Sequence, residues 1–509
     1  MAYILTTGGF GLPTKNLRNN SIDVFKPGFY LKPHNLSPHY AVIEAMHGAG
    51  ALGGRTRSKW VDRLNWVYES VNFRGFQLSV PWGLYEKGAA GGDFSNLDYL
   101  EEVVDELGAN GKYVMLMSHQ FREFRNNDVS DLSVDDQMRY LLPQDLRTHQ
   151  GMVNSIDCLT SLGETIHTVT SAPANSFGVN GDYAHIVASN MLYGPKAGVW
   201  PAGVDLNLND PRKHWLWDNA YAYSKFVSGA MGFDMKIYKP ALRTRMAAFQ
   251  QAVADRFNNK PHVIAITTTE SAVGSPIYLG AAAGGIVSDD LDANAGAVNV
   301  STNVHRAMLS GKTAVLQATR PKFPSKIFAQ DINTPLDTIN YVKEYFDQAT
   351  ANKMGATSSD TVWWSDGLKR PDEPKKGCLV RMSENSSIMP IISQWQQWCW
   401  DSNLAKSPNI TSTQDFLDRF QNVFDMATVG NATTGFGLDA HMVIIQLETA
   451  MGIWVGGGTY SAPQSVGPNI PVVVPSLKDW LKAKFAAEGI TDGSGGLNVS
   501  RPQYTTSVA

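Results

Sequence analysis

Apolar segments that favour β-strands alternate with segments of helical period along most of the chain, and this alternation limits the possible folds more than any other feature. Residues 97–107 carry apolar side chains at helical spacing, and the apolar segment 112–120 follows. The same order returns at 242–257, followed by 262–270. Segments in this order form parallel strands joined by crossover helices.

The whole chain contains eight candidate strands of this kind: residues 28–35, 75–82, 112–120, 262–270, 326–332, 361–367, 389–395 and 441–448. Capping patterns at Ser412 and Ser476 predict two of the later helices. Between the sixth and seventh candidate strands, the segment LVRMSENSS has to supply a short or degenerate helix. Eight strands, each followed by a helix, predict a closed (β/α)8 TIM barrel rather than an open doubly wound sheet.

One long segment interrupts the alternation after the third strand. Residues 121–235 are polar and rich in Asn and Gly, and they leave from the face of the barrel where long loops shape active sites. We therefore predict a single barrel domain over residues 1–489, with this insertion narrowing the cleft through Trp200, Trp215 or Trp217. A structural flap or an assembly surface is the alternative. Residues 490–509 are predicted to form a flexible tail.

Composition excludes several classes of function. The chain has 43 Lys and Arg against 47 Asp and Glu, so it offers no basic field for nucleic acid. Its three cysteines form no CxxC pair, and neither a metal motif such as HExxH nor a nucleotide-binding glycine loop is present. We therefore expect no metal and no cofactor. No apolar run is long enough for a membrane span and the start lacks a secretory signal, so we expect a cytoplasmic or virion-associated protein.

Polar and aromatic side chains follow the predicted strands, and in a barrel such positions converge on one face. Indole rings stack on the CH face of a sugar, while amides, hydroxyls and imidazoles bind its hydroxyl groups. The candidates for sugar contact are Asn35, Trp82, His119, Gln120, Thr269, Trp364, Asp366, Trp395, Gln397 and Trp398. Carboxylates at strand ends add the groups that glycosidic bond cleavage requires, namely a proton donor and a second carboxylate.

Two stretches also resemble a known family. GFQLSVPWGLYEKGAAGGDFSNLDYLEEVVDELGANGKYVMLMSHQ is similar to the second-to-third strand region of barrel glycoside hydrolases of the cellulase-like and β-galactosidase-like superfamily. FQQAVADRFNNKPHVIAITTTESAVG resembles the fourth strand of that superfamily, whose terminal Glu is the acid/base. The resemblance implies that role for Glu270. It departs from the family pattern at Thr269, where Asn is usual, and at the seventh strand, where QWQQW holds no nucleophilic Glu.

The second carboxylate is therefore either Glu448, our first choice, or Glu384, unless the chain has lost it. The favoured reading is a glycoside hydrolase that cleaves a poly- or oligosaccharide by a retaining mechanism, with Glu270 as acid/base. The alternative is a non-catalytic carbohydrate-binding or structural protein on the same barrel, for instance a component of a phage particle that assembles with other subunits. A barrel enzyme of another class, such as a lyase, is a third possibility.

Overall fold

The computed structural model describes most of the barrel and parts of the connections between its strands. The description covers residues 23–33, 39–47, 73–87, 92–119, 122–124, 143, 165–194, 196–205, 221–225, 231–235, 237, 240–268, 275–276, 311–332, 341–358, 361, 369, 371–372, 376–395, 410–431, 433–446, 458–461, 471–491 and 493–505. Structural statements below concern these residues.

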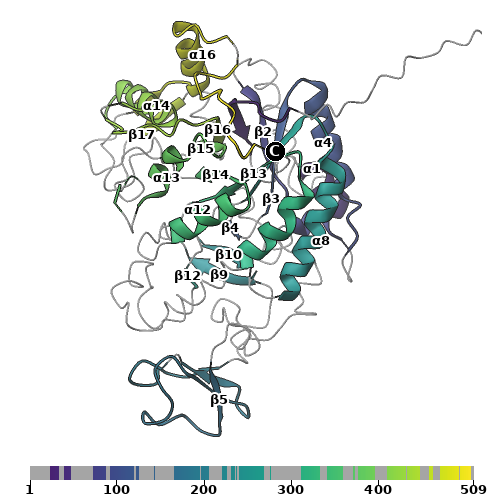
Figure 1. Cartoon of the computed structure of the whole chain (residues 1–509), viewed down its shortest axis with the longest axis vertical. Helices are drawn as coiled ribbons and strands as arrows, with labels where there is room; N and C mark the ends of the chain where they lie inside the picture. The colour runs from purple at the N-terminus through teal and green to yellow at the C-terminus, as the bar shows by residue number, and fades with distance from the viewer. Residues whose placement is uncertain are drawn as a thin grey trace, which may run out of the picture.

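Eight parallel strands close into a barrel, which confirms the predicted fold (Figure 1). In order around the barrel, each strand pairs in parallel with both of its neighbours. In chain order the strands are β1 (Gly28–Lys32), β2 (Phe73–Ser79), β3 (Tyr113–His119), β11 (Val263–Thr268), β13 (Ile327–Asp331), β14 (Gly355–Ser358), β15 (Ile391–Trp395) and β16 (Met442–Gln446).

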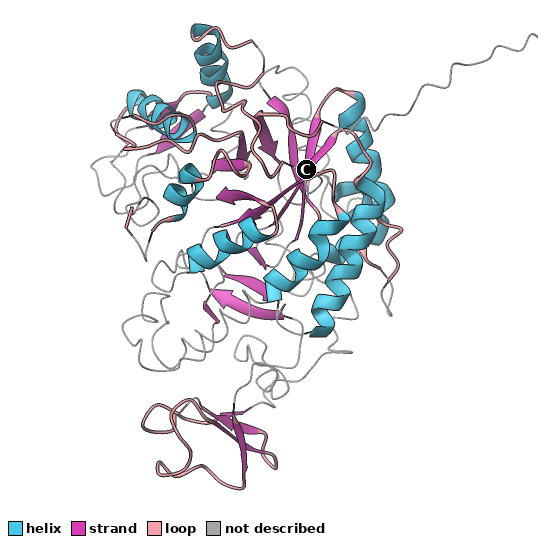
Figure 2. Ribbon diagram, in the orientation of Figure 1, coloured by secondary structure: helices cyan, strands magenta, loops and turns pink. Residues whose placement is uncertain are grey.

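Helices surround this barrel (Figure 2). Those with full bounds are α1 (Tyr40–His47), α3 (Trp82–Tyr85), α4 (Leu97–Ala109), α8 (Pro240–Phe257), the 3-10 helix η3 (Arg320–Lys322), α12 (Tyr341–Ala351), α13 (Cys378–Glu384), α14 (Thr413–Ala427) and α16 (Leu477–Ala487). The short α13 is the helix expected between the sixth and seventh strands. Both predicted caps are present, since Ser412 and Ser476 accept backbone N–H groups at the starts of α14 and α16.

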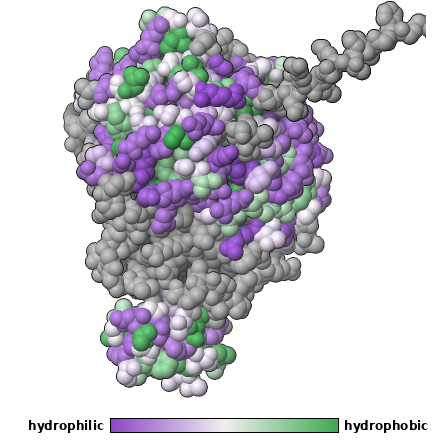
Figure 3. Space-filling view, in the orientation of Figure 1, coloured by the Kyte–Doolittle hydropathy of each residue, from purple (hydrophilic) through white to green (hydrophobic). Residues whose placement is uncertain are grey.

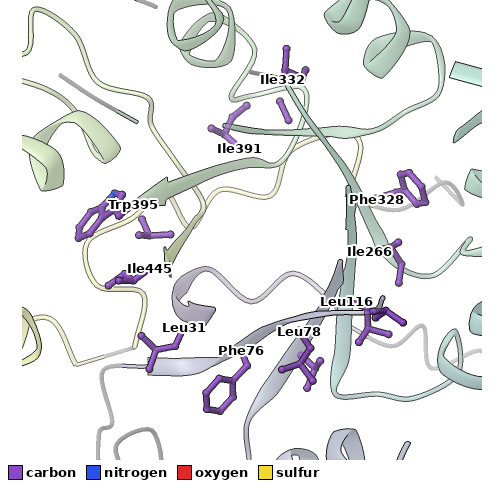
Figure 4. Packing of buried hydrophobic residues seen from close by; sticks show 14 of the residues in the cluster. Leu31, Phe76, Leu78, Leu116, Ile266, Phe328, Ile332, Ile391, Trp395 and Ile445 are labelled. Atoms are coloured by element: carbon purple, nitrogen blue, oxygen red, sulfur yellow. The ribbon is translucent and has the colours of Figure 1, made fainter. Parts of the chain in front are cut away.

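Side chains alternate along each strand between the barrel interior and the helix layer. Phe328 contacts Phe323 just after η3, so it lies outside the barrel, and its neighbours Ile327 and Ala329 therefore point inward. Figure 4 shows labelled side chains such as Phe76 and Trp395 outside the ring of strands. The two sets form separate buried clusters, the larger between strands and helices and the smaller inside the barrel.

The sixth strand differs from the prediction. It is β14 (Gly355–Ser358), with the sequence GATS, and not residues 361–367. Only Thr361 of that predicted segment is described, and it lies outside the strand. Small residues suit β14 because a Cβ on Gly355 would lie 2.6 Å from the carbonyl oxygen of Pro390. The β-branched and aromatic residues of 361–367 suggested a strand, but close packing against Pro390, the residue before β15, selected GATS.

The insertion after β3 contributes to two further sheets. One combines β4 (Arg122–Phe124), β9 (Tyr221–Lys225) and β10 (Met231–Met235) with β12 (Ser275–Pro276) from the connection after β11. The other consists of β5 (Ile166–Val169), β6 (Tyr183–Ile186), β7 (Met191–Tyr193) and β8 (Val204–Asp205). We call residues 165–205 the β5–β8 lobe. Figure 1 shows this lobe at the lower end of the molecule, outside the ring of barrel helices.

The end of the chain packs on the barrel, in contrast to the expectation of a flexible tail. The backbone N–H of Asn498 donates to the carbonyl oxygen of Ala440 at 2.9 Å, and that of Tyr504 donates to Ile388 at 2.8 Å. Leu497 is buried beside these contacts. Ala440 and Ile388 precede β16 and β15, so the tail covers the edge of the barrel where strands begin. Figure 1 shows the C-terminus over the barrel.

A hairpin of β17 (Gly458–Ser461) and β18 (Pro471–Val474) lies between β16 and α16 in the chain. Among the helices that the structure describes, none combines the length and the apolar character that crossing a lipid bilayer requires.

Candidate active site at the barrel mouth

The edge of the barrel where the strands end, here called the barrel mouth, is lined by inward-pointing polar residues. Asp331 ends β13 on the same face as Ile327 and Ala329, which belong to the interior cluster. On β15, Gln394 follows the interior residue Ile392 by two positions. Strand alternation therefore directs both polar side chains into the barrel. Active sites of TIM-barrel enzymes lie at this edge.

Asp331 is the centre of a buried hydrogen-bond network that spans four strands. Its backbone N–H donates to Thr268 Oγ1 at 2.8 Å, which links β13 to the last residue of β11. Gln394 Nε2 donates to Asp331 Oδ2 at 3.3 Å and to Thr357 Oγ1 at 2.6 Å. All four residues are at most 3% exposed. A carboxylate held in this way has a fixed direction, which is what substrate positioning and catalysis require.

Further polar side chains lie on other strands of the barrel, outside this network. Gln77 Nε2 donates to Thr267 Oγ1 at 2.9 Å, while the buried Gln77 Oε1 has no hydrogen-bond partner among the described residues. Lys32, the last residue of β1, is partly buried and places Nζ 3.9 Å from Met117 Sδ. The barrel mouth therefore holds a cation and a carboxylate over an interior that is not wholly apolar.

The sequence offered Asp331 only as one of several polar residues near the end of the fifth strand. Gln330, Asp331 and Asn333 all follow the same apolar run, and strand alternation alone does not say which of them points inward. The pairing of Asp331 with Thr357, together with the bond from Gln394, distinguishes it. The sequence therefore showed that polar residues follow the fifth strand. It did not show the register of that strand in the barrel, which decides the residue that points inward.

The catalytic carboxylates predicted first, Glu270 and Glu448, lie outside the described residues. In the sequence, each comes two residues after the end of a barrel strand, Glu270 after Thr268 of β11 and Glu448 after Gln446 of β16. The ends of β11 and β16 both belong to the barrel mouth. The connections that start from them therefore leave at the edge where Asp331 lies.

Glu384 lies elsewhere. It ends α13, is exposed, and forms an ion pair with Lys376 at 2.8 Å. The chain then runs through Ser386, whose hydroxyl donates to Asp439 just before β16. This places Glu384 near the edge where strands begin, opposite the barrel mouth. The placement revises the prediction of a catalytic role for Glu384, because a substrate at the mouth is out of its reach.

Two tryptophans predicted to stack on sugars are core residues. Trp395 is fully buried, packs edge-on against Phe29 at 5.5 Å between ring centroids, and donates from Nε1 to Ser393 Oγ at 3.1 Å. Trp82 is 1% exposed and stacks on Phe249 of α8. Neither ring faces the barrel mouth, which revises the prediction that they contact substrate. Both indoles lie between the strands and the helices.

His119 is also enclosed in the helix layer. Its Nε2 lies 2.9 Å from Thr319 Oγ1, and its ring packs edge-on against Phe328 outside the barrel. Burial lowers the pKa of His119 to about 3, so the imidazole is neutral at physiological pH. These contacts make His119 a residue that joins β3 to the outer layer, and its predicted contact with sugar is revised accordingly.

The other predicted contact residues lie outside the described part of the chain. They are Asn35, Gln120, Thr269, Trp364, Asp366, Gln397 and Trp398. Their roles stay predictions. Trp215 and Trp217 of the insertion also lie outside it, whereas Trp200 belongs to the β5–β8 lobe. No group of three or more His, Cys, Asp or Glu residues among those described could hold a metal ion.

No protein-family model and no curated protein matches this chain. Its fold is similar to that of a β-galactosidase from the psychrophilic Marinomonas ef1, with 9% identity over 92% of this chain and 61% of that chain and a TM-score of 0.40. Isomaltulose synthases from Klebsiella sp. LX3 and Erwinia rhapontici NX5 are similar at 8% and 9% identity, over 95% and 94% of this chain and 74% of theirs, with TM-scores of 0.37 and 0.38. Similarities at this level carry no functional argument. The assignment of the barrel fold is based on the strand pairing described above.

Proposed function

We propose that the protein is a carbohydrate-active enzyme, a glycoside hydrolase that cleaves a poly- or oligosaccharide at the barrel mouth. The observation that carries the proposal is the buried network around Asp331, which holds a carboxylate at the ends of the strands. The family resemblance of the segment that ends in Glu270 supports the same reaction. Together they supply the two kinds of carboxyl group that glycoside cleavage needs.

In the proposed reaction, the Glu270 carboxyl group donates its proton to the glycosidic oxygen as the bond to the anomeric carbon breaks. A second carboxylate forms a bond to that carbon. Glu270, now ionised, then removes a proton from water, and the hydroxide displaces the second carboxylate. Glu448 is the first candidate for this nucleophile from the sequence. Asp331 is the candidate that the structure adds, because it points into the barrel beside β11.

The experiment compares Glu270→Gln, Glu448→Gln and Asp331→Asn on glycosides with poor and good leaving groups. Glu270→Gln should lower the rate by roughly two to four orders of magnitude on ordinary glycosides, the range for general acid catalysis. It should cost far less on dinitrophenyl glycosides, whose leaving group departs without a proton. The variant that lacks the nucleophile should be equally impaired on both substrates.

Azide separates the two candidate nucleophiles. In Glu448→Ala or Asp331→Ala, a small anion can occupy the space of the lost carboxylate and attack the anomeric carbon directly. The variant that lacks the nucleophile should therefore yield a glycosyl azide of inverted configuration, which NMR of the product identifies. If neither variant responds to azide and both retain wild-type activity, neither residue is the nucleophile.

One observation favours the non-catalytic alternative. The inward residue at the end of β15 is Gln394, an amide at the strand whose end carries the nucleophile in the resembled family. If the wild-type protein binds oligosaccharides and cleaves none, and if Glu270→Gln and Asp331→Asn bind equally well, the hydrolase proposal fails. The protein would then be a carbohydrate-binding or structural component, with assembly into a particle as the next property to test.

A further inference from the structure

The β5–β8 lobe carries an unusual share of exposed apolar side chains. Seven large hydrophobic residues are exposed in the described part of the chain, and four of them belong to this lobe of about forty residues. They are Phe177, Val179, Val187 and Val199, with exposed fractions of 38%, 70%, 63% and 59%. Figure 3 shows hydrophobic surface at several places on the lobe, among hydrophilic residues. Exposed apolar side chains that gather in one place make a candidate interaction surface.

Three of these side chains join Trp200 on two adjoining loops. Gly181 N–H donates to the Lys196 carbonyl oxygen at 2.8 Å, and Gly198 N–H donates to Asn180 Oδ1 at 2.7 Å. The rings of Phe177 and Trp200 stack at 6.3 Å between centroids. We call Phe177, Val179, Val199 and Trp200 the aromatic patch.

The aromatic patch is held rigidly. Trp200 Nε1 is 3.1 Å from the carbonyl oxygens of both Ala174 and Phe177, which fixes the plane of the indole. Gly178 has a φ of +68°, and a Cβ there would lie 3.2 Å from the Trp200 ring, so only glycine fits without strain. A preorganised surface loses little conformational entropy when a ligand binds.

The charged side chains near the patch form hydrogen bonds and an ion pair within the lobe. Lys196 Nζ donates to the carbonyl oxygens of Phe177 and Gly178, both at 2.8 Å, and lies 5.9 Å from the Trp200 ring centroid. Asp182 Oδ2 accepts from the Val179 N–H at 2.9 Å and lies 2.7 Å from His167 Nε2. The aromatic patch therefore presents a neutral surface.

We propose that the aromatic patch binds a neutral carbohydrate chain, at a site separate from the barrel mouth. The patch consists of four side chains, whereas a stable protein interface needs roughly 800 Å² and 20–30 residues on each partner. Phe177 is exposed and Trp200 is partly exposed, and aromatic rings suit the CH face of a pyranose. Asn175 and Asn180 accept backbone N–H groups through Oδ1, and no described residue accepts from their Nδ2 groups, which leaves donors for sugar hydroxyls.

The test is native affinity electrophoresis of the full chain in gels that contain hydroxyethylcellulose, galactomannan or pullulan, with acidic polygalacturonate as comparison. The wild type should be retarded in at least one neutral gel. Phe177→Ala and Val179→Ser should weaken that retardation at least fivefold. Val187→Ser is the matched control, because Val187 is exposed on the same lobe but lies outside the patch, and it should leave retardation unchanged.

Running the same gels with the Glu270→Gln protein separates this proposal from hydrolysis. Retardation that depends on Phe177 in that background supports the aromatic patch whether or not the barrel cleaves glycosides. Hydrolysis of a small aryl glycoside should be the same for wild type and Phe177→Ala. Absence of retardation in every neutral gel, retardation in polygalacturonate alone, or equal retardation of wild type and Phe177→Ala would overturn the proposal.

Discussion

Three histidines of the barrel, His39, His119 and His441, are buried in the neutral form. Burial lowers the pKa of His39 and of His119 to about 3, and that of His441 to about 4. In His441 the hydrogen-bond geometry acts in the same direction, because Nδ1 accepts the Ile391 N–H at 3.0 Å and a proton on that nitrogen would break the bond. Each imidazole therefore stays uncharged while the protein is folded.

This neutrality predicts a loss of stability in mild acid. Below pH 6.5 the unfolded chain protonates all three imidazoles, while the folded chain protonates none until about pH 4, so protons favour unfolding. The free energy of unfolding should be highest above pH 6.5 and fall by about 2 kcal/mol per histidine between pH 7 and pH 5. Urea titrations at both pH values measure this fall, and His119→Gln should reduce it by about a third. A free energy that does not change over this range would contradict the assignment.

Neighbouring residues in one strand point to opposite sides of the barrel wall. This alternation limited what the sequence revealed about the site. Gln394 points to the barrel mouth and bonds Asp331, while Trp395 beside it packs on Phe29 in the helix layer. Both residues follow the same apolar run, so the sequence predicts a polar and an aromatic group near the strand end without their directions. Only the register of the closed barrel decides between substrate contact and core.

Among the elements, helices and strands with strong periodicity were predicted well. The helix α4 and the strand β15 lie where their apolar spacing placed them, because packing and intrinsic preference agree there. The strand β14 was missed because GATS carries little β preference, and its place depends on close contact with Pro390. Tertiary packing overrode local preference at that element.

The capping box of α14 gives a prediction at this scale. Ser412 Oγ accepts the N–H of Asp415, and Asp415 Oδ2 accepts the N–H of Ser412 at 2.8 Å. Ser412→Ala leaves the Asp415 N–H without its acceptor and should lower the free energy of unfolding by about 1 kcal/mol. Ser412→Asp restores an acceptor and should be close to neutral. Equal stability of wild type and Ser412→Ala in urea would show that water replaces the cap at no cost.

At the scale of the whole molecule, connections far apart in the chain complete the barrel at both edges. Beyond the barrel mouth, β4 and β10 from the insertion share a sheet with β12 from the connection after β11. At the opposite edge, the C-terminal segment contacts residues that precede β15 and β16. Such pairings join segments that are distant in sequence and carry no local periodicity, so the sequence could not reveal them. The expectation of a flexible tail rested on the usual behaviour of chain ends.

From these contacts we predict that removing the tail lowers the free energy of unfolding. Removing residues 490–509 leaves the carbonyl oxygens of Ala440 and Ile388 without their N–H donors, at about 1 kcal/mol for each bond. It also exposes the apolar surface that Leu497 covers, at roughly 1.5–3 kcal/mol. The ion pair of Arg501 with Asp23 is exposed and adds little.

The expected loss, about 3.5–5 kcal/mol by addition of these costs, is a large part of the 5–15 kcal/mol that stabilises an ordinary domain. A chain that ends at Gly489 should have its unfolding midpoint at a clearly lower urea concentration than the full chain, or fail to accumulate as soluble protein. A chain that ends at Thr505 keeps every tail contact described here and is the matched control. If both truncated chains unfold at the urea concentration of the full chain, the contacts between the tail and the edge of the barrel where the strands begin do not stabilise the fold.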